Sequence, residues 1–210
     1  MDVGDALASR RMVRSFDGVP LDEVIVTSIF QEALRAPTAG NARGIEWVVL
    51  LGTSETSLYF DAATDEAWRL TSPRWPGLTR ASAVGICLAD PGAYGARYAD
   101  DDKSSSGLGT GPDAWPVPYW IGDAGASTMA SLLLANEAGL DAAFLGAFRR
   151  ISEIKEAIGI PEGSIIYGAI LLGHGDGADH RSHSLDRPGP TRVERIHRGR
   201  YETHQLRERR

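Results

Sequence analysis

The sequence predicts a single α+β domain, and three observations support this fold class. Short apolar runs with the composition of buried strands alternate with segments that have helical periodicity. The chain has 210 residues, which is enough for one substantial core and short for two. No internal repeat with a period of about 20 to 50 residues is visible, which argues against a solenoid. Residues 1–210 are therefore expected to form one domain.

The first half of the chain predicts two helices and two strands. Residues 21–36 place most of their apolar side chains on one helical sector, and Pro37 is expected to end that helix. Residues 46–51 form an apolar run rich in β-branched and aromatic side chains, which is typical of a buried strand. A helix is expected over 54–70 and a second strand over 83–89.

Residues 91–120 differ from the rest of the chain and predict a long excursion from the core. Charged and small residues fill its first part, and Trp115, Tyr119 and Trp120 stand among prolines near its end. Long loops in compact domains are often functional. This excursion is therefore a candidate substrate lid. Its aromatic residues could equally serve to pack the core or a dimer interface.

The second half of the chain completes the alternation of helices and strands. Asp123 has the character of an N-cap for a long helix that ends near Gly139, and a short strand follows over 141–148. Ser152 is expected to cap another helix, and residues 164–172 form the last apolar strand.

The composition is that of a soluble globular protein, with 42% hydrophobic and 24% charged residues. No apolar run approaches the roughly 18 residues of a membrane span, and the acidic N-terminus lacks the apolar stretch of a signal peptide. The single cysteine, Cys87, lies within an apolar strand pattern and is interpreted as a small buried hydrophobe. A cytoplasmic location is expected.

A basic extension is predicted at residues 181–210, where nine Arg stand against four acidic residues, although the whole chain carries a net charge of −6. A basic tail can bind nucleic acid. This one lacks interleaved aromatic residues and follows an acidic body, so contact with a partner subunit or with a cofactor phosphate is favoured. No nucleic-acid or membrane partner is expected.

The sequence does not support a nucleotide-binding glycine loop, a hydrolase triad or a metal site. The glycine-rich stretch 107–112 has no preceding strand, and Pro112 stands where a last glycine would be needed to bind a nucleotide. No Gly-x-Ser-x-Gly elbow supports a hydrolase triad. His180 and His183 lack further ligands at metal-site spacing, so no metal is predicted.

Two motifs near the N-terminus point to chemistry. Arg10, Arg11 and Arg14 offer guanidinium groups, whose planar donors match the oxygens of a phosphate. About one helix length later, residues 36–41 read Ala-Pro-Thr-Ala-Gly-Asn, small residues that would let backbone amides approach a flat polar ring. The alternative interpretation is that the three arginines form a solvated basic patch without a ligand.

In order and spacing, these motifs resemble the opening of the nitroreductase family of FMN-dependent flavoproteins. The resemblance continues through the expected long helix from Asp123 to Leu140, the Phe144-Leu145-Gly146 stretch, and the tail at 192–197. It implies a three-layer fold in which helices flank a mostly antiparallel sheet. It also implies a homodimer with flavin sites shared between the subunits.

The resemblance also implies roles for individual residues. Arg10 and Arg11 would bind the FMN phosphate and ribityl chain, with Met12 in the same segment, and Arg14 would approach the pyrimidine edge of the flavin. A loop from the other subunit would reach the flavin through Pro37, Thr38, Ala39 and Asn41. Leu145 and Gly146 would lie near flavin N5. One tail arginine, Arg187 or Arg192, would complete the phosphate site.

The implied activity is NAD(P)H-dependent reduction of an electron-poor acceptor, a nitroaromatic or a quinone, by ping-pong hydride transfer through flavin N5. No protein acid or base is expected, because the cofactor carries the chemistry. Another flavin-dependent reaction stays open, such as oxidation or desaturation of a biosynthetic intermediate or reductive dehalogenation, as does a flavin-binding protein without turnover. Arg43 stands where many relatives have Gln, which makes it a further candidate for shaping substrate preference.

Overall fold

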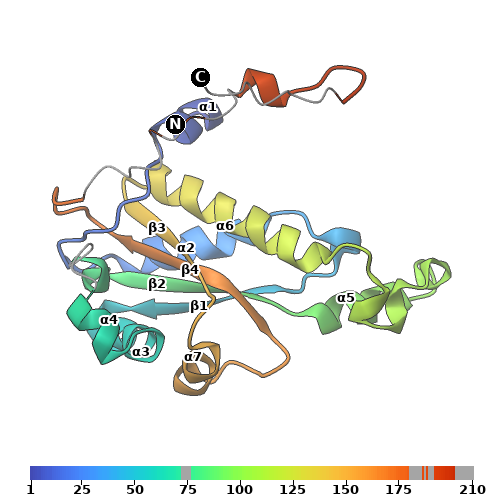
Figure 1. The fold of residues 1–210 in the computed structure, drawn as a ribbon, viewed down its shortest axis with the longest axis horizontal. Helices are drawn as coiled ribbons and strands as arrows, with labels where there is room; N and C mark the ends of the chain where they lie inside the picture. Colours follow the sequence, from blue (N-terminus) through green and yellow to red (C-terminus); the bar gives the residue numbers. More distant parts are fainter. Residues whose placement is uncertain (72–76, 180–185, 187, 189–191, 202–210) are drawn as a thin grey trace, which may run out of the picture. The chain divides into compact units, whose positions relative to one another are not determined.

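The computed structural model shown in Figure 1 describes residues 1–71, 77–179, 186, 188 and 192–201. It divides into two compact units, Met1–Asp179 and His180–Arg210. The first unit contains the sheet and every α-helix found among the described residues. Within the second, the described residues include one 3-10 turn, Val193–Arg195, and a contact between the rings of His197 and Tyr201.

The centre of the first unit is a four-stranded antiparallel sheet with the strand order β1-β2-β4-β3. The strands are β1 (Ile45–Leu51), β2 (Ala83–Ala89), β3 (Asp141–Gly146) and β4 (Ile165–Gly173). Every residue of β2 is buried, because this strand is paired on both edges and covered on both faces. All four strands lie where the sequence predicts strands.

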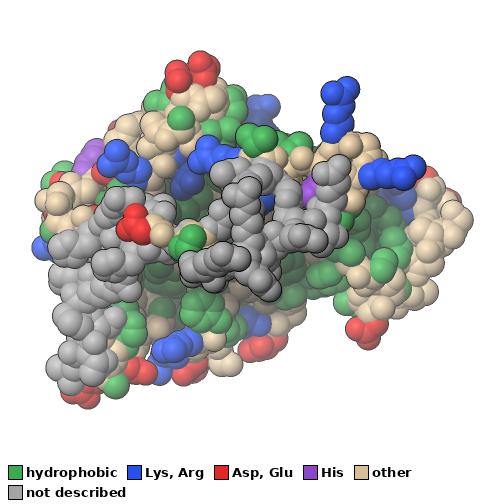
Figure 2. Space-filling model, turned by 45° about the horizontal axis from the view of Figure 1, so that its top comes forward, with side chains coloured by type: hydrophobic (Ala, Val, Ile, Leu, Met, Phe, Trp, Pro, Cys, Tyr) green, Lys and Arg blue, Asp and Glu red, His purple; other side chains and the backbone are tan. Residues whose placement is uncertain are grey.

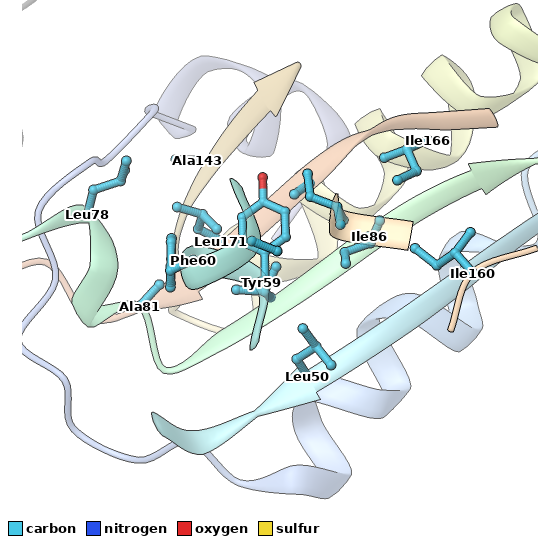
Figure 3. Close-up of a cluster of buried hydrophobic side chains, with 14 of the residues drawn as sticks. Leu50, Tyr59, Phe60, Leu78, Ala81, Ile86, Ala143, Ile160, Ile166 and Leu171 are labelled. Carbon is cyan, nitrogen blue, oxygen red and sulfur yellow. The ribbon is translucent and has the colours of Figure 1, made fainter. Parts of the chain in front are cut away.

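Helices cover both faces of the sheet (Figure 1). On one face, α2 (Glu23–Ala33) and α6 (Tyr119–Glu137) pack with Ala83, Ile170 and Leu172. On the other, α3 (Gly52–Ala63) and α7 (Ile151–Ile158) pack with the alternate strand residues, including Ile86 and Leu171 (Figure 3). Successive side chains of a strand point to opposite faces, so one strand serves both cores. The predicted three-layer α+β arrangement is confirmed.

Several predicted element boundaries are wrong. The helix expected over 54–70 is two helices, α3 and α4 (Glu66–Thr71), because Thr64 takes an extended conformation between them. The first predicted helix ends at Ala33, four residues before Pro37, and Ser152 lies inside α7, which begins after Arg150. A short helix, α1 (Val3–Ser9), is additional to the prediction and is capped by the side chain of Asp2.

The excursion at 91–120 is more ordered than its composition suggests. It begins with α5 (Pro91–Ala99), capped by Asp90, and continues through the 3-10 turns Ser104–Ser106, Leu108–Thr110 and Pro112–Ala114. The long helix α6 then begins at Tyr119, so Asp123 lies within its first turns and is not its N-cap. No helix in the described part of the chain combines the length and apolarity needed to cross a bilayer.

Candidate active site

The arginine-containing segment runs along the edge of the sheet. Met12 forms a parallel bridge with Ala142 of β3, and the Val13 amide donates to the Ala142 carbonyl at 2.9 Å. Farther along, Phe16 bridges to Gly175 beyond the end of β4 and is fully buried. Backbone pairing and one aromatic anchor therefore fix the position of the arginines that flank Met12.

Arg10 and Arg11 line one cavity of about 360 Å³ with residues of α6 and β3, including Asn136 and Asp141. The Nε of Arg10 is buried and has no hydrogen-bond partner. A buried donor without a partner costs about 1–3 kcal/mol, more for a charged group. The Asp141 carboxylate in this cavity accepts from the Gly175 amide at 2.7 Å. An anionic group beside Arg10 would satisfy the unpaired donor.

Arg14 lies in a second cavity of about 410 Å³, here called the Arg14 cavity, which Leu145 and Gly146 at the end of β3 also line. The Arg14 guanidinium donates to the Met12 carbonyl at 3.4 Å, which turns it back along its own segment. The structure thus brings together three residues that the resemblance assigns to the flavin ring, although Arg14 is 131 residues from Leu145 in the sequence.

The loop from Pro37 to Arg43 lines a third cavity of about 960 Å³, through Pro37, Thr38, Asn41 and Arg43. Three of its residues have positive φ, at 61° for Gly40, 57° for Asn41 and 55° for Arg43. Sparsely populated backbone conformations of non-glycine residues cost about 1–3 kcal/mol each and persist only when the surroundings impose them. The contacts of this loop supply that constraint.

Side chains from α5 and α6 hold the loop. The Asp123 carboxylate accepts hydrogen bonds from the Ala39 amide at 2.8 Å and from the Tyr94 hydroxyl at 2.7 Å. The Arg97 Nε donates to the Gly40 carbonyl at 2.9 Å. Burial and the hydrogen bond to Asp123 raise the pKa of Tyr94, so this hydroxyl stays a neutral donor. Helix α5, through Tyr94 and Arg97, therefore helps to hold the Pro37–Arg43 loop in place.

The aromatic residues proposed for a lid have two different environments. Trp115 and Trp120 are buried and stack edge-on against Tyr94, whereas Tyr119 is half exposed. The two tryptophans thus pack under the Pro37–Arg43 loop within this chain. A role in covering substrate stays a prediction for all three predicted lid aromatics.

Within one chain, the predicted cofactor residues other than Met12, Ala39 and the two tail arginines line three separate cavities. Of the two tail candidates, Arg187 lies outside the described residues, and Arg192 is exposed in the second unit. Sequence reasoning did not find the roles of Asp123, Tyr94 and Arg97, because no local pattern marks contacts between residues 29 to 84 positions apart. Asp123 carried a signal, its position near a helix start, but that signal suggested a cap.

The single cysteine has a structural role. Cys87 is fully buried, and burial raises the pKa of its thiol to about 12, which confirms its interpretation as a small hydrophobe. Among the described residues there is no group of three or more His, Cys, Asp or Glu that could hold a metal ion. On the face shown in Figure 2, basic and acidic side chains are interspersed with apolar ones.

Comparisons with known proteins agree with this geometry. The sequence profile of the Nitroreductase family matches residues 7–174. A provisionally named NADH dehydrogenase/NAD(P)H nitroreductase of Archaeoglobus fulgidus is 24% identical over 190 residues, which cover 89% of this chain and 93% of that protein.

Two solved structures show the same fold. An FMN-dependent nitroreductase of Clostridium difficile is 18% identical, with a TM-score of 0.65 over 95% of this chain and all of that one. A nitroreductase family protein of Clostridium novyi is 17% identical, with a TM-score of 0.64 over 85% of this chain and 87% of that one. With a profile match that spans most of its length, the chain belongs to the nitroreductase family.

Proposed function

We propose that this protein is an FMN-dependent oxidoreductase that uses NAD(P)H to reduce an electron-poor acceptor, a nitroaromatic or a quinone. Family membership supports the oxidoreductase class, and the names of relatives support FMN and NAD(P)H. The observation that carries the proposal is the unpaired, buried Nε of Arg10 beside Arg11, with Arg14 set against Leu145 and Gly146 in the next cavity.

These residues fit the chemistry of FMN. Arg10 and Arg11 would hold the phosphate, since a guanidinium pairs with phosphate oxygens through parallel hydrogen bonds. Arg14 would place a positive charge at the pyrimidine edge, where negative charge develops on reduction. Backbone amides near Leu145 and Gly146 would face the ring. The apolar walls of the Arg14 cavity would exclude water from it.

When bound, FMN supplies the redox chemistry, by taking a hydride from NAD(P)H and delivering two electrons to the acceptor. With a quinone, the overall reaction consumes one NAD(P)H and one proton and yields the hydroquinone. The chain's own contribution is to bind and orient the cofactor and to keep its pyrimidine edge electropositive. No protein acid or base needs to act between the two half-reactions.

The proposal includes a homodimer in which the Pro37–Arg43 loop completes the site of the partner. The separation of this loop's cavity from the Arg14 cavity within one chain supports that arrangement. The tail would add Arg187 or Arg192 at the phosphate.

A visible absorption spectrum of the purified protein tests the proposal. We expect a flavin spectrum, release of the chromophore as FMN on heating, and bleaching when NADH or NADPH is added without oxygen. Added 1,4-benzoquinone should then restore the oxidised spectrum. Bound flavin that neither nicotinamide reduces would leave only a flavin-binding protein. A colourless protein that does not take up added FMN would contradict the proposal entirely.

A further inference from the structure

We propose that the acceptor is a planar, conjugated organic acid, and that Arg149 at the rim of the Arg14 cavity selects it by pairing with its carboxylate. This inference rests on the proposed function and names the substrate class of that same site. It is carried by the make-up of the cavity, which is apolar at its base, aromatic at its mouth, and free of acidic side chains among the described residues that line it.

The base of the cavity suits an apolar ring. Tyr59 and Phe60 of α3 (Figure 3) and Ile154 of α7 line it, and all three are buried in the hydrophobic cluster of that face. Transfer of apolar surface from water to such a pocket is favourable by about 25 cal/mol for each Å². A planar conjugated molecule can gain this free energy, whereas a small hydrophilic acceptor cannot.

The mouth of the cavity carries an exposed aromatic side chain. Phe148 is 81% exposed, and its ring lies against Gly146, close enough that a Cβ on Gly146 would come within 3.0 Å of it. An exposed phenylalanine in contact with a residue proposed to face the flavin is a ready surface for stacking. Aromatic rings prefer offset or edge-on contacts, which a planar ligand at this position could make.

The charge at the mouth determines the class of ligand. Arg149 is exposed, and the described residues give its guanidinium no ion pair or hydrogen bond. The neighbouring Arg150 differs, since it donates to the Ala62 carbonyl at 2.6 Å and lies 3.5 Å from the Glu153 carboxylate. Arg150 therefore has a structural role, while Arg149 has none that the fold explains.

The other polar side chains of the cavity reinforce this charge. Besides Arg149 they are Arg14, Thr64, Tyr59 and Trp68, which are cationic or neutral, and no described lining residue is Asp or Glu. Burial raises the pKa of Tyr59 to about 12, so its hydroxyl stays protonated at neutral pH. A cationic acceptor would meet only repulsion here, whereas a carboxylate would find a planar fork of donors.

The reaction of such a substrate balances without a further reactant. For a nitrobenzoate, the hydride of one NAD(P)H and one proton from solution together supply the two electrons and two hydrogens that convert the nitro group to a nitroso group. One N–O bond breaks and one water leaves, while NAD(P)+ is released. The carboxylate is unchanged and serves only as the handle that Arg149 holds.

The test compares two substrates of equal shape, 4-nitrobenzoate and the neutral 4-nitrobenzamide, with the FMN-loaded enzyme. We expect kcat/KM to favour the acid by roughly 10-fold or more, as for a charge-assisted hydrogen bond. Arg149→Gln should abolish the preference by lowering kcat/KM for the acid alone, and Arg149→Lys should keep most of it. Lys103→Gln, which removes a cation that lines none of the described cavities, should leave the preference intact.

A binding measurement supports the kinetics. In the absence of nicotinamide, titration calorimetry should show that benzoate binds more tightly than benzamide to the FMN-loaded enzyme, and that Arg149→Gln removes the difference. Because Arg149 is exposed and no described residue pairs with it, the variant should retain the melting temperature of the parent. The inference is overturned by equal kcat/KM for acid and amide in the parent enzyme, or by an Arg149→Gln effect confined to KM for NAD(P)H.

Failure of the proposed function would look different. In that case, neither nitrobenzamide nor benzoquinone would be reduced, and the inference would fall with it. Turnover of both neutral acceptors without a preference for the acid would remove the inference and leave the proposed function standing.

Discussion

The Arg10–Phe16 segment and the Pro37–Arg43 loop are both proposed to contact FMN, yet they are held in place by opposite means. Backbone pairing with Ala142 and Gly175 fixes the first segment. Side chains from α5 and α6 fix the second, against backbone conformations that are unfavourable in themselves. The first segment thus needs no arginine side chain to hold it, and the buried Nε of Arg10 has no hydrogen-bond partner among the described residues, whereas the loop depends on residues more than fifty positions away.

If this comparison is right, the largest effect on stability should come from the loop's support. Asp123→Ala removes two hydrogen bonds and leaves the buried Tyr94 hydroxyl without its acceptor. We expect the free energy of unfolding of the FMN-free protein to fall by about 2–4 kcal/mol, measured by urea denaturation. Asp123→Asn keeps one acceptor oxygen and should lose less. Equal stability of Asp123→Ala and the parent would show that the loop is held by something else.

The next effect tests the left-handed backbone of the loop directly. Gly40→Ala would add a Cβ about 2.8 Å from the Tyr98 ring at a residue whose φ is 61°. Overpacking and backbone strain together should lower the free energy of unfolding by about 1–3 kcal/mol. Gly163→Ala serves as the control, since a Cβ there meets nothing within 4 Å. A loop that tolerates both substitutions equally would be less constrained than we describe.

A smaller effect of opposite sign is expected at Arg43. Glycine adopts positive φ without steric cost, so Arg43→Gly should raise the free energy of unfolding by up to about 1 kcal/mol. Asn41→Gly, at nearly the same φ, should gain less, because asparagine already tolerates this conformation. Thermal unfolding of the FMN-free variants would measure both, and a loss of stability in Arg43→Gly would indicate that its side chain contributes a contact.

Substitution in the Arg10–Phe16 segment should have the smallest effect on the free energy of unfolding and a large effect on the affinity for FMN. Arg10→Ala removes a side chain whose buried Nε has no partner among the described residues, so the free energy of unfolding without FMN should fall by no more than about 0.5 kcal/mol. FMN should bind roughly 10- to 100-fold more weakly, because a charge-assisted hydrogen bond to phosphate is lost. Flavin fluorescence titration measures this, with the exposed Arg198→Ala as control. Unchanged affinity would contradict the phosphate assignment.

The same contrast explains what the sequence could predict. Strand and helix positions follow from local periodicity, and β1 to β4 were found because buried strands are short apolar runs. The arginine segment was recognisable because its function resides in residues that are adjacent in sequence. The support of the loop was not, since Asp123, Tyr94 and Arg97 come together only through the packing of α5 and α6.

Two further features of the structure could not be predicted from the sequence, for physical reasons. The break between α3 and α4 depends on one extended residue, Thr64, in an otherwise helical pattern. The Arg14 cavity gathers residues from α3, α4, β3 and α7, and only the folded chain shows that Phe148 and Arg149 stand at its mouth.

The central claim is that one flavin site is built from the arginine segment of one chain and the loop of its partner. Arg10→Ala and Asp123→Ala chains should be co-expressed with different affinity tags, and the mixed dimer isolated by tandem purification. At an FMN concentration where neither mutant homodimer binds, a shared site predicts about one FMN for each mixed dimer, because one of its two sites has both intact parts. A mixed dimer that binds no FMN would contradict the claim and place both parts of the site within a single chain.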